Sequence, residues 1–210
     1  MDFTEVLRGI ELVESPSKPT HASALLVWFS RPKASARRVL ELGSGSGIVS
    51  IAIAKLYRRK VTGIEIVPEL VEAARKSANL NGVEVDFIEG DVSRIEELVE
   101  AESFDMVVSN PPHHIGKIES PNFYRKMARN ADEKIIETFT KAMFWSLKNG
   151  GEYVLVLSPE RLIDWLCALR EKRLEPKRMI FFHPKDKAEL VGVRGRKNGK
   201  SGLVVETPLF

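Results

Sequence analysis

From residue 38 onward the chain alternates short apolar segments with longer amphipathic ones, and this alternation constrains the fold more than any other feature. Six short segments have the composition of buried strands: residues 38–42, 61–66, 85–88, 104–109, 153–157 and 179–182. The segments between them repeat apolar residues at helical spacing: residues 48–57, 68–81, 92–99, 131–147 and 159–172. Strands that alternate with helices of this length form a parallel sheet with helices on both faces. We therefore predict an α/β fold with a Rossmann-like, doubly wound sheet.

The end of the chain predicts a seventh strand at residues 203–206, reached through a basic loop at residues 183–202. A parallel return needs a crossover of about a dozen residues, usually a helix, and no helix is predicted here. We therefore expect a seven-stranded, mostly parallel sheet whose last strand is antiparallel. The segment at residues 113–130 is polar and basic, and we expect it to be irregular.

The N-terminal part precedes the alternation. Thr20 is a suitable N-cap for a helix at residues 21–29, whose Leu and Phe residues form an apolar face. We expect residues 1–35 to form a short helical extension and residues 36–210 the Rossmann-like core. A length of 210 residues suits a single domain built from both parts.

Composition excludes several classes of protein. The single cysteine, Cys167, excludes an internal disulfide framework and a multi-cysteine zinc site. No apolar run approaches the roughly 20 residues of a membrane helix, and the charged start is unlike a signal peptide. We therefore expect a cytoplasmic protein without a membrane partner, as a monomer or a weak dimer. The chain has no Gln and is rich in Lys, Arg and Glu, which favours a thermophilic source.

The net charge of +3 is the sum of two unlike regions. Residues 176–201 hold eight Lys and Arg against only Asp186 and Glu189, so the rest of the chain is slightly acidic. Such asymmetry is typical of proteins that bind a polyanion, and equally of an ordinary solvated surface. Two adjacent histidines, His113 and His114, have no evident third ligand, so we predict no metal site.

A glycine-rich segment, ELGSGSG at residues 41–47, follows the first predicted strand and opens the next helix. Glycines there let a ligand approach the backbone, and the helix N-terminus offers free N–H groups. The spacing departs from the dinucleotide fingerprint G-x-G-x-x-G, because the third glycine comes one residue early. This departure weakens an NAD-binding interpretation without excluding it.

Two acids end the next two strands. Glu65 lies 20 residues after Gly45, where an acid accepts hydrogen bonds from the ribose hydroxyls of an adenosine-bearing cofactor. Asp91 suits an adenine amino group, with the Val92 N–H facing the ring, and it suits a helix N-cap equally well. Open α/β sheets bind ligands at the carboxyl ends of their strands, where all these groups are expected.

The segment Asn110-Pro111-Pro112-His113 follows the fourth strand. Proline fixes φ and lacks an N–H, and the residue before a proline is held extended. The Asn110 side chain and the Pro111 carbonyl therefore present two fixed acceptors, which suit the two hydrogens of an –NH2 group. Accepting these hydrogens returns electron density to a nitrogen whose lone pair is delocalised, and the His113 ring can stack on a planar acceptor. A structural proline-rich turn is the alternative.

The motifs ELGSGSG, GIEIVPE, EGDV and SNPPHH resemble the consecutive motifs of class I S-adenosylmethionine-dependent methyltransferases. NPP followed by an aromatic residue marks the branch that methylates amino groups. The order of the motifs and the tail, FFHPKDKAE…LVVETPLF, are similar to the bacterial tRNA(Val) adenine-N6 methyltransferase group. The resemblance covers roughly residues 20–210. The chain departs from the pattern at His113, where Tyr is usual, and at Ala22, where the first helix usually carries an acid.

The resemblance implies S-adenosylmethionine as the cofactor, with the glycines at its methionine part, Glu65 at its ribose and Asp91 at its adenine. It places the target amine against Asn110, Pro111 and His113, the expected catalytic residues. The full set of candidate cofactor residues is Glu41, Gly43, Ser44, Gly45, Gly47, Glu65, Ile66, Asp91, Val92 and Asn110. The candidate substrate residues are Pro112, Arg125, Arg129, Arg194, Arg196 and Lys197.

These observations together predict an enzyme that methylates an exocyclic amino group, with adenine N6 in a tRNA-like RNA as the favoured acceptor. A target base must leave its stack, and the basic residues would hold phosphates. Four alternatives stay open. In the first two, the chain is still a methyltransferase, and its acceptor is either a protein glutamine, which presents the same –NH2, or adenine in DNA. In the third alternative the chain is an NAD oxidoreductase, and in the fourth it is a non-catalytic RNA-binding module with a vestigial cofactor pocket.

Overall fold

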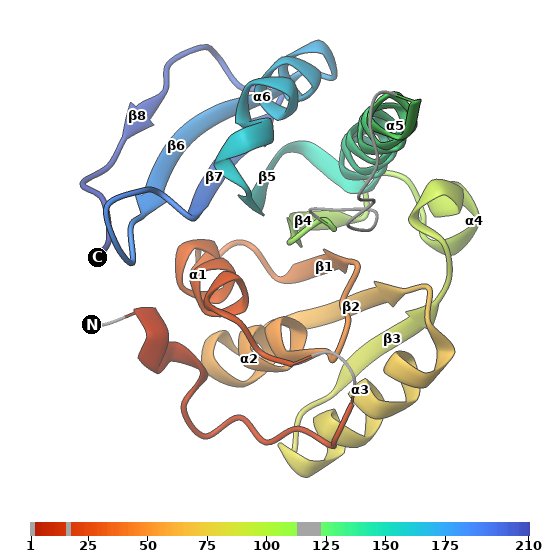
Figure 1. Ribbon diagram of the computed structural model, residues 1–210. Helices are drawn as coiled ribbons and strands as arrows, with labels where there is room; N and C mark the ends of the chain where they lie inside the picture. The colour runs from red at the N-terminus through yellow and green to blue at the C-terminus, as the bar shows by residue number, and fades with distance from the viewer. Residues whose placement is uncertain (1–2, 16–17, 113–122) are drawn as a thin grey trace.

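The structure, a computed structural model, describes residues 3–15, 18–112 and 123–210, and describes residues 123–132 by their backbone alone. Its strands are β1 (Arg38–Leu42), β2 (Lys60–Glu65), β3 (Val85–Glu89), β4 (Phe104–Ser109), β5 (Leu147–Leu157), β6 (Leu174–Phe182), β7 (Leu190–Lys197) and β8 (Val204–Val205). They form one sheet in the order β3-β2-β1-β4-β5-β7-β6-β8 (Figure 1). The first five strands pair in parallel, and β7 runs antiparallel to both its neighbours. The predicted mostly parallel α/β sheet is therefore confirmed.

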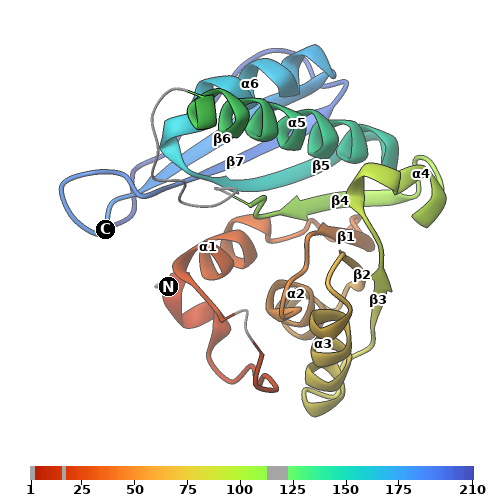
Figure 2. The same cartoon turned by 45° about the vertical axis from the view of Figure 1, so that its right-hand side comes forward.

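The helices are η1 (Phe3–Leu7), α1 (His21–Ser30), α2 (Ile48–Tyr57), α3 (Pro68–Leu80), η2 (Val92–Arg94), α4 (Ile95–Leu98), α5 (Phe123–Ser146), η3 (Pro159–Arg161) and α6 (Leu162–Glu171). Figure 2 shows α1, α2 and α3 on one face of the sheet, with α5 and α6 on the other. A large apolar cluster fills the space on each face and forms the core. Within the described ranges, no helix is both long and apolar enough to cross a membrane.

The N-terminal helix forms where the sequence predicts it. Thr20 is extended, its side chain accepts a hydrogen bond from Ser23 N, and Ser23 reciprocates as a capping box. Leu25 and Leu26 are fully buried and pack α1 against the sheet.

The basic segment at residues 183–202 is not the predicted loop, and this expectation is wrong. Its central part is β7, which lies between β5 and β6 and supplies the antiparallel strand. The segment at residues 203–206 contributes β8, which pairs in parallel with β6 at the edge, so the sheet has eight strands among the described residues. Glycines obscure β7 in the sequence, yet Gly195 is needed there, because a Cβ would lie 2.3 Å from the Tyr153 ring.

Helix α5 is longer than expected, because it begins at Phe123 inside the segment predicted to be irregular. Its first turns, FYRKMARN, carry too few regularly spaced apolar residues to reveal a helix. Strands β5 and β6 also begin earlier than predicted, at Leu147 and Leu174.

The direction of the strands defines two ends of the sheet. Since β1 to β5 run in parallel, their last residues lie together at the carboxyl end and their first residues at the amino end. Antiparallel β7 begins at the carboxyl end, where Val191 pairs with Leu157, and finishes at the amino end.

Candidate functional site at the carboxyl end of the sheet

The glycine-rich segment forms a tight turn between β1 and α2. Gly43, Gly45 and Gly47 have φ values of 72°, 52° and 77°, in the left-handed region that favours glycine. A Cβ on Gly47 would lie 2.7 Å from the Phe87 ring and 2.8 Å from Ala74 Cβ. Gly47 therefore lets the start of α2 pack closely against α3 and β3.

Glu41 supports this turn from within the core. Gly47, the N-cap of α2, has no side chain to satisfy the free N–H groups of the helix. The Glu41 carboxyl accepts instead, from Ser50 N at 2.9 Å and from the Ser50 hydroxyl. Burial raises the pKa of Glu41 to about 8, although the Ser50 hydrogen bonds act in the opposite direction. Glu41 thus holds the turn in place and does not line the cavity beside it.

A cavity of about 580 Å³ opens at the carboxyl end of the sheet, between the ends of β2, β3 and β4 and helix α5. Its volume lies within the roughly 300–1,000 Å³ that is typical of small-molecule sites. Seven of the predicted site residues line it: Gly43, Glu65, Ile66, Asp91, Val92, Asn110 and Pro112. Residues at the ends of four strands, β1 to β4, and residues of helix α5 therefore converge on one space.

The two predicted acids are held differently. Glu65 is buried, and its carboxylate accepts from Gly45 N at 2.8 Å and from Val67 N at 3.0 Å. Asp91 is exposed and N-caps η2, accepting from Ser93 N at 2.8 Å. A carboxylate oxygen has more than one acceptor position, so both groups can still accept from a ligand.

Asn110 lies at the wall of the cavity, beyond the end of β4. Its neighbour Ser109 is buried, and its hydroxyl donates to Leu42 O at 2.7 Å, which ties the ends of β4 and β1 together. Asn110 Oδ1 is buried and has no hydrogen-bond partner among the described residues. An unpartnered buried acceptor costs about 1–3 kcal/mol and is rare, so this oxygen points to a donor supplied by a ligand.

Ser44, in the glycine-rich turn, shows the same feature. Its side chain is buried, and Oγ has no partner in the part of the chain that the structure describes. A ligand at the turn would therefore find a free hydroxyl as well as the N–H groups at the start of α2.

These groups fit the cofactor that the sequence resemblance implies. S-adenosylmethionine carries a cationic sulfonium, a ribose diol and an adenine amino group. The buried Glu65 carboxylate, the exposed Asp91 carboxylate and the free Ser44 oxygen offer acceptors of the matching kind. The cavity is also large enough to hold a molecule of this size.

Sequence reasoning missed the contribution of α5. Lys134, Ile135, Thr138 and Phe139 line the cavity from this helix. A Cβ on Gly43 would lie 3.9 Å from the Phe139 ring, so this ring closes the cavity near the glycine-rich turn. The spacing i, i+1, i+4 and i+5 puts these residues on one helical face, but nothing distinguishes that face from a core face in the sequence.

Two of the three basic residues of β7 are not available to a substrate. Arg194 is buried, donates to Phe29 O and Ser30 O at 3.2 Å each, and pairs with Glu152. Lys197 is also buried, and its ammonium group has three partners: Glu102 Oε1 at 2.8 Å, Phe144 O at 2.7 Å and Leu147 O at 2.8 Å. The expectation that these two cations contact a substrate is wrong, because both already neutralise internal groups.

The remaining candidates lie elsewhere. Arg196 is exposed but belongs to the amino end of the sheet, away from the cavity, where it pairs with Glu152 across the strands. His113 and the side chains of Arg125 and Arg129 lie outside the described residues. Pro111 is buried and Pro112 is exposed. Among the residues that the structure describes, no three His, Cys, Asp or Glu side chains gather as a metal site.

Comparison with known proteins agrees with this site. The family model "Methyltransferase small domain" matches residues 13–162 of the chain. A tRNA1(Val) adenine-N6 methyltransferase of Phocaeicola vulgatus is 25% identical over 74% of this chain and 66% of its own length. A relative from Methanocaldococcus jannaschii, provisionally named a protein N5-glutamine methyltransferase, is 36% identical over 69% of this chain and 74% of its own. The chain spans about half to two thirds of the length of the first tRNA methyltransferases it matches.

A solved structure shares the fold. A 16S rRNA N2-guanine methyltransferase of Thermus thermophilus, in complex with S-adenosylmethionine and guanosine, superimposes with a TM-score of 0.63. It is 24% identical, and the match covers 87% of this chain and 44% of that one. The family match agrees with the resemblance of the motifs, and the groups that line the cavity fit S-adenosylmethionine, the cofactor that this resemblance implies. The chain therefore belongs to the methyltransferase small domain family.

Proposed function

We propose that this protein methylates the exocyclic N6 amino group of an adenine in RNA, with a tRNA as the favoured substrate. The observation that carries the proposal is the buried, unpartnered Asn110 Oδ1 at the wall of the cofactor cavity. It stands beside the Pro111 carbonyl in a segment that two prolines make rigid. Two fixed acceptors at the mouth of a methyl-donor site suit an acceptor nitrogen that carries two hydrogens.

The proposed chemistry needs few protein groups. S-adenosylmethionine supplies an electrophilic methyl group on its sulfonium. Asn110 Oδ1 and the Pro111 oxygen each accept a hydrogen bond from one N–H of the target amino group. These two hydrogen bonds aim the nitrogen lone pair and stabilise the positive charge that develops on nitrogen. Alignment of donor and acceptor supplies much of the acceleration. No strong base is required, because the methylated nitrogen becomes acidic and loses its proton to water.

We further propose roles for the residues around the cofactor. Glu65 accepts from the ribose hydroxyls, and its two backbone donors, Gly45 and Val67, fix the carboxylate for that purpose. Asp91 accepts from the adenine amino group. Phe139 and Thr138 cover the cofactor from α5.

The tRNA methyltransferase from P. vulgatus supports RNA as the acceptor. The basic character of the chain, with a pI near 8.9, supports it too, because phosphates bind cations. A second candidate, a glutamine side chain in a protein, is favoured by the M. jannaschii relative, which has a higher identity and is matched over a larger share of its own length than the P. vulgatus enzyme. Its amide –NH2 offers the Asn110 and Pro111 oxygens the same two hydrogens, so the reaction chemistry does not separate the two.

The test is the distribution of a radiolabelled methyl group from S-adenosylmethionine over separate tRNA, rRNA, DNA and protein fractions. The proposal predicts label in tRNA that digests to N6-methyladenosine. Label in protein that hydrolyses to N5-methylglutamine would replace the proposal by the second candidate. Label in DNA alone would equally refute RNA as the acceptor.

A further inference from the structure

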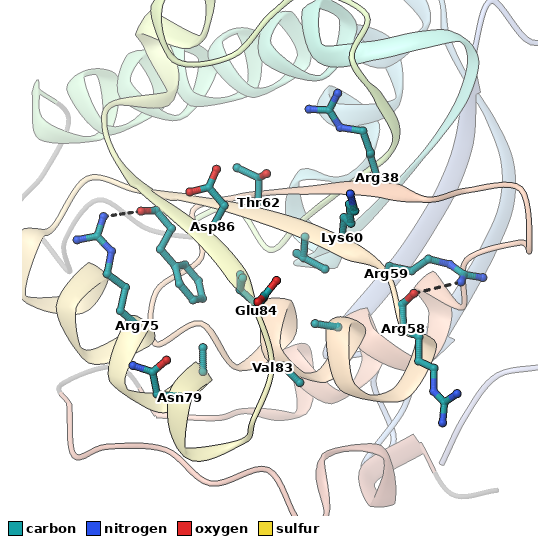
Figure 3. Close-up of a pocket in the computed structure, with 15 residues that line it drawn as sticks. Arg38, Arg58, Arg59, Lys60, Thr62, Arg75, Asn79, Val83, Glu84 and Asp86 are labelled. Atoms are coloured by element: carbon teal, nitrogen blue, oxygen red, sulfur yellow. Dashed lines mark hydrogen bonds between the residues drawn. The ribbon is translucent and has the colours of Figure 1, made fainter.

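The amino end of the sheet, opposite the cofactor cavity, carries a hollow of about 1120 Å³, which is larger than that cavity (Figure 3). We call it the Arg59 groove. It lies beside β2 and β3, between the first residues of β1 and the second half of α3. Its charged lining residues are five cations and two carboxylates: Arg38, Arg58, Arg59, Lys60, Arg75, Glu84 and Asp86. The groove is therefore basic even though two acids also line it.

The cations of the Arg59 groove are mostly free of acidic partners. No ion pair is recorded for Arg38, Arg58 or Lys60 among the described residues, and all three are exposed. In Figure 3, Arg38, Lys60, Arg59 and Arg58 follow one another along one side of the hollow. Repulsion between neighbouring cations is unfavourable, so an unneutralised row of this kind favours binding of an anion.

Arg59 adds an observation of a different kind. Its guanidinium is anchored by carbonyl groups, with Nη2 donating to Lys33 O at 3.2 Å and Nη1 to Arg58 O at 3.5 Å. Its Nε is buried and finds no acceptor in the described part of the chain. A buried donor without a partner is costly, and an anionic oxygen in the groove would satisfy it.

A second basic hollow, which we call the Arg196 groove, lies farther along the same end of the sheet. It has a volume of about 670 Å³ and runs between residue 33, the end of β7 and the start of β6. Glu152 is its lone carboxylate, and its cations are Lys33, Lys177, Arg178, Arg194, Arg196 and Lys200. Arg178 pairs with Glu206, and the single carboxylate of Glu152 is shared by Lys33, Arg194 and Arg196. The cations of this groove therefore outnumber the carboxylates beside them.

The two grooves are neighbours. A smaller hollow of about 190 Å³ shares Lys33, Glu152 and Arg196 with the Arg196 groove and reaches Asp105. Asp105 accepts from Arg37 N at 2.8 Å and from Arg38 N at 2.9 Å, so it adjoins the Arg59 groove. A track of positive charge therefore follows the amino end of the sheet from β3 to β6.

We propose that this track binds the sugar-phosphate backbone of the RNA substrate, at a distance from the nucleotide that is modified. This inference rests on the proposed function. Four of the five cations of the Arg59 groove are arginines, whose planar donors match phosphate oxygens in pairs. None of the large apolar side chains that the structure exposes lines either groove, whereas protein partners usually bury apolar and aromatic groups at the centre of an interface.

The position of the track has a consequence for the substrate. Arg38 and Lys60 each lie five residues before a residue that lines the cavity, Gly43 and Glu65, so about 16 Å of extended strand separates these two cations from the cavity. A short single-stranded oligonucleotide that is bound in the cavity does not also fill the track. The substrate is therefore a folded RNA that extends well beyond the target nucleotide, and the track recognises its shape and charge but not its sequence.

The test uses the double variant Arg58→Asn, Lys60→Gln. Both side chains are exposed and have no recorded partner, and Asn tolerates the left-handed φ of 52° at position 58. The control is Arg8→Gln, Lys141→Gln, which removes two cations that line neither groove. Binding of fluorescently labelled whole tRNA is measured by anisotropy at a series of salt concentrations, and methyl transfer is measured on tRNA and on a short oligonucleotide.

We expect the groove variant to weaken tRNA binding roughly tenfold at low salt and to reduce the slope of log K against log salt by about 2. KM for tRNA rises while kcat is unchanged, and turnover of the short oligonucleotide matches that of the wild type. Equal affinities and slopes for the groove variant and the control would overturn the inference. Loss of binding to polyglutamate with unchanged tRNA binding would assign the track to an acidic protein and overturn it as well. The methyl-transfer assay tests the proposed function separately from the binding assay. Absence of any methyl transfer to RNA would refute that function.

Discussion

The buried carboxyl of Glu41 makes the stability of this protein depend on pH in a predictable way. Its pKa is raised from 4.5 to about 8 by burial, so the folded chain holds a proton that the unfolded chain releases. At 1.36 kcal/mol per pH unit, a difference of this size corresponds to about 5 kcal/mol, as an order of magnitude. Below pH 4.5 both states are protonated and there is no penalty. Stability therefore falls as the pH rises from about 4.5 to about 8.

The perturbation is Glu41→Gln. Glutamine keeps an oxygen that accepts from Ser50 N and from the Ser50 hydroxyl, but it has no charge to bury. The difference in unfolding free energy between variant and wild type should favour the variant increasingly with pH. It should grow by about 5 kcal/mol between the two pKa values.

The assay is guanidinium unfolding followed by tryptophan fluorescence at pH values across this range. The difference in unfolding free energy between variant and wild type cancels the contributions of the other titratable groups, because these are the same in both proteins. Glu133→Gln, at an exposed position on α5, controls for the loss of one carboxylate. A difference between Glu41→Gln and wild type that stays constant with pH would refute the reasoning, because Glu41 would then ionise alike in both states.

Three further substitutions test the supports of the site. Gly47→Ala places a Cβ 2.7 Å from the Phe87 ring at a φ of 77°, so it should cost about 2 kcal/mol or more in denaturant unfolding, and a neutral result would contradict the packing described. Glu152→Ala leaves Arg194 buried without its acid and should cost about 3–5 kcal/mol; a loss below 1 kcal/mol in thermal unfolding would show that the pair is solvated. Ser109→Ala removes one buried hydrogen bond and should cost about 1 kcal/mol, with a measurable loss of methyl transfer, whereas unchanged turnover would show that this tie does not position Asn110.

Much of the first half of the fold could be predicted because its signals are local. The bounds of β1, α2 and β4 agree with the sequence patterns, since glycines and prolines mark where these elements begin and end. Glycines and prolines also mark the strand ends at which Asn110 and Glu65 are predicted. Because these strands run in parallel, both residues line one cavity.

The second half was harder to predict because its determinants are distant in sequence. Arg194 is paired with carbonyls 164 and 165 residues away and with Glu152, and Lys197 with Glu102. A window of sequence shows only a basic, glycine-rich segment, which is typical of a loop. Pairing with these distant partners makes the segment a strand, β7, and two of its cations, Arg194 and Lys197, are buried in those pairs.

The residues of α5 escaped prediction for a similar reason. Lys134 and Thr138 line the cavity because α5 packs against β4 and β5, which lie elsewhere in the sequence. The helix has no motif, and its start lies in a polar segment.

The central claim is that Asn110 Oδ1 receives the amino group of the acceptor, and the Asn110→Ala variant tests it most directly. Its affinity for S-adenosylmethionine is measured by calorimetry and its methyl transfer to tRNA by radiolabel. The control is Glu171→Ala, which removes an exposed polar side chain from the end of α6 that lines neither the cavity nor the two grooves. The account predicts that Asn110→Ala binds the cofactor within a few-fold of wild type yet loses at least about a hundredfold in methyl transfer, while Glu171→Ala keeps both. Full methyl transfer by Asn110→Ala would contradict the account.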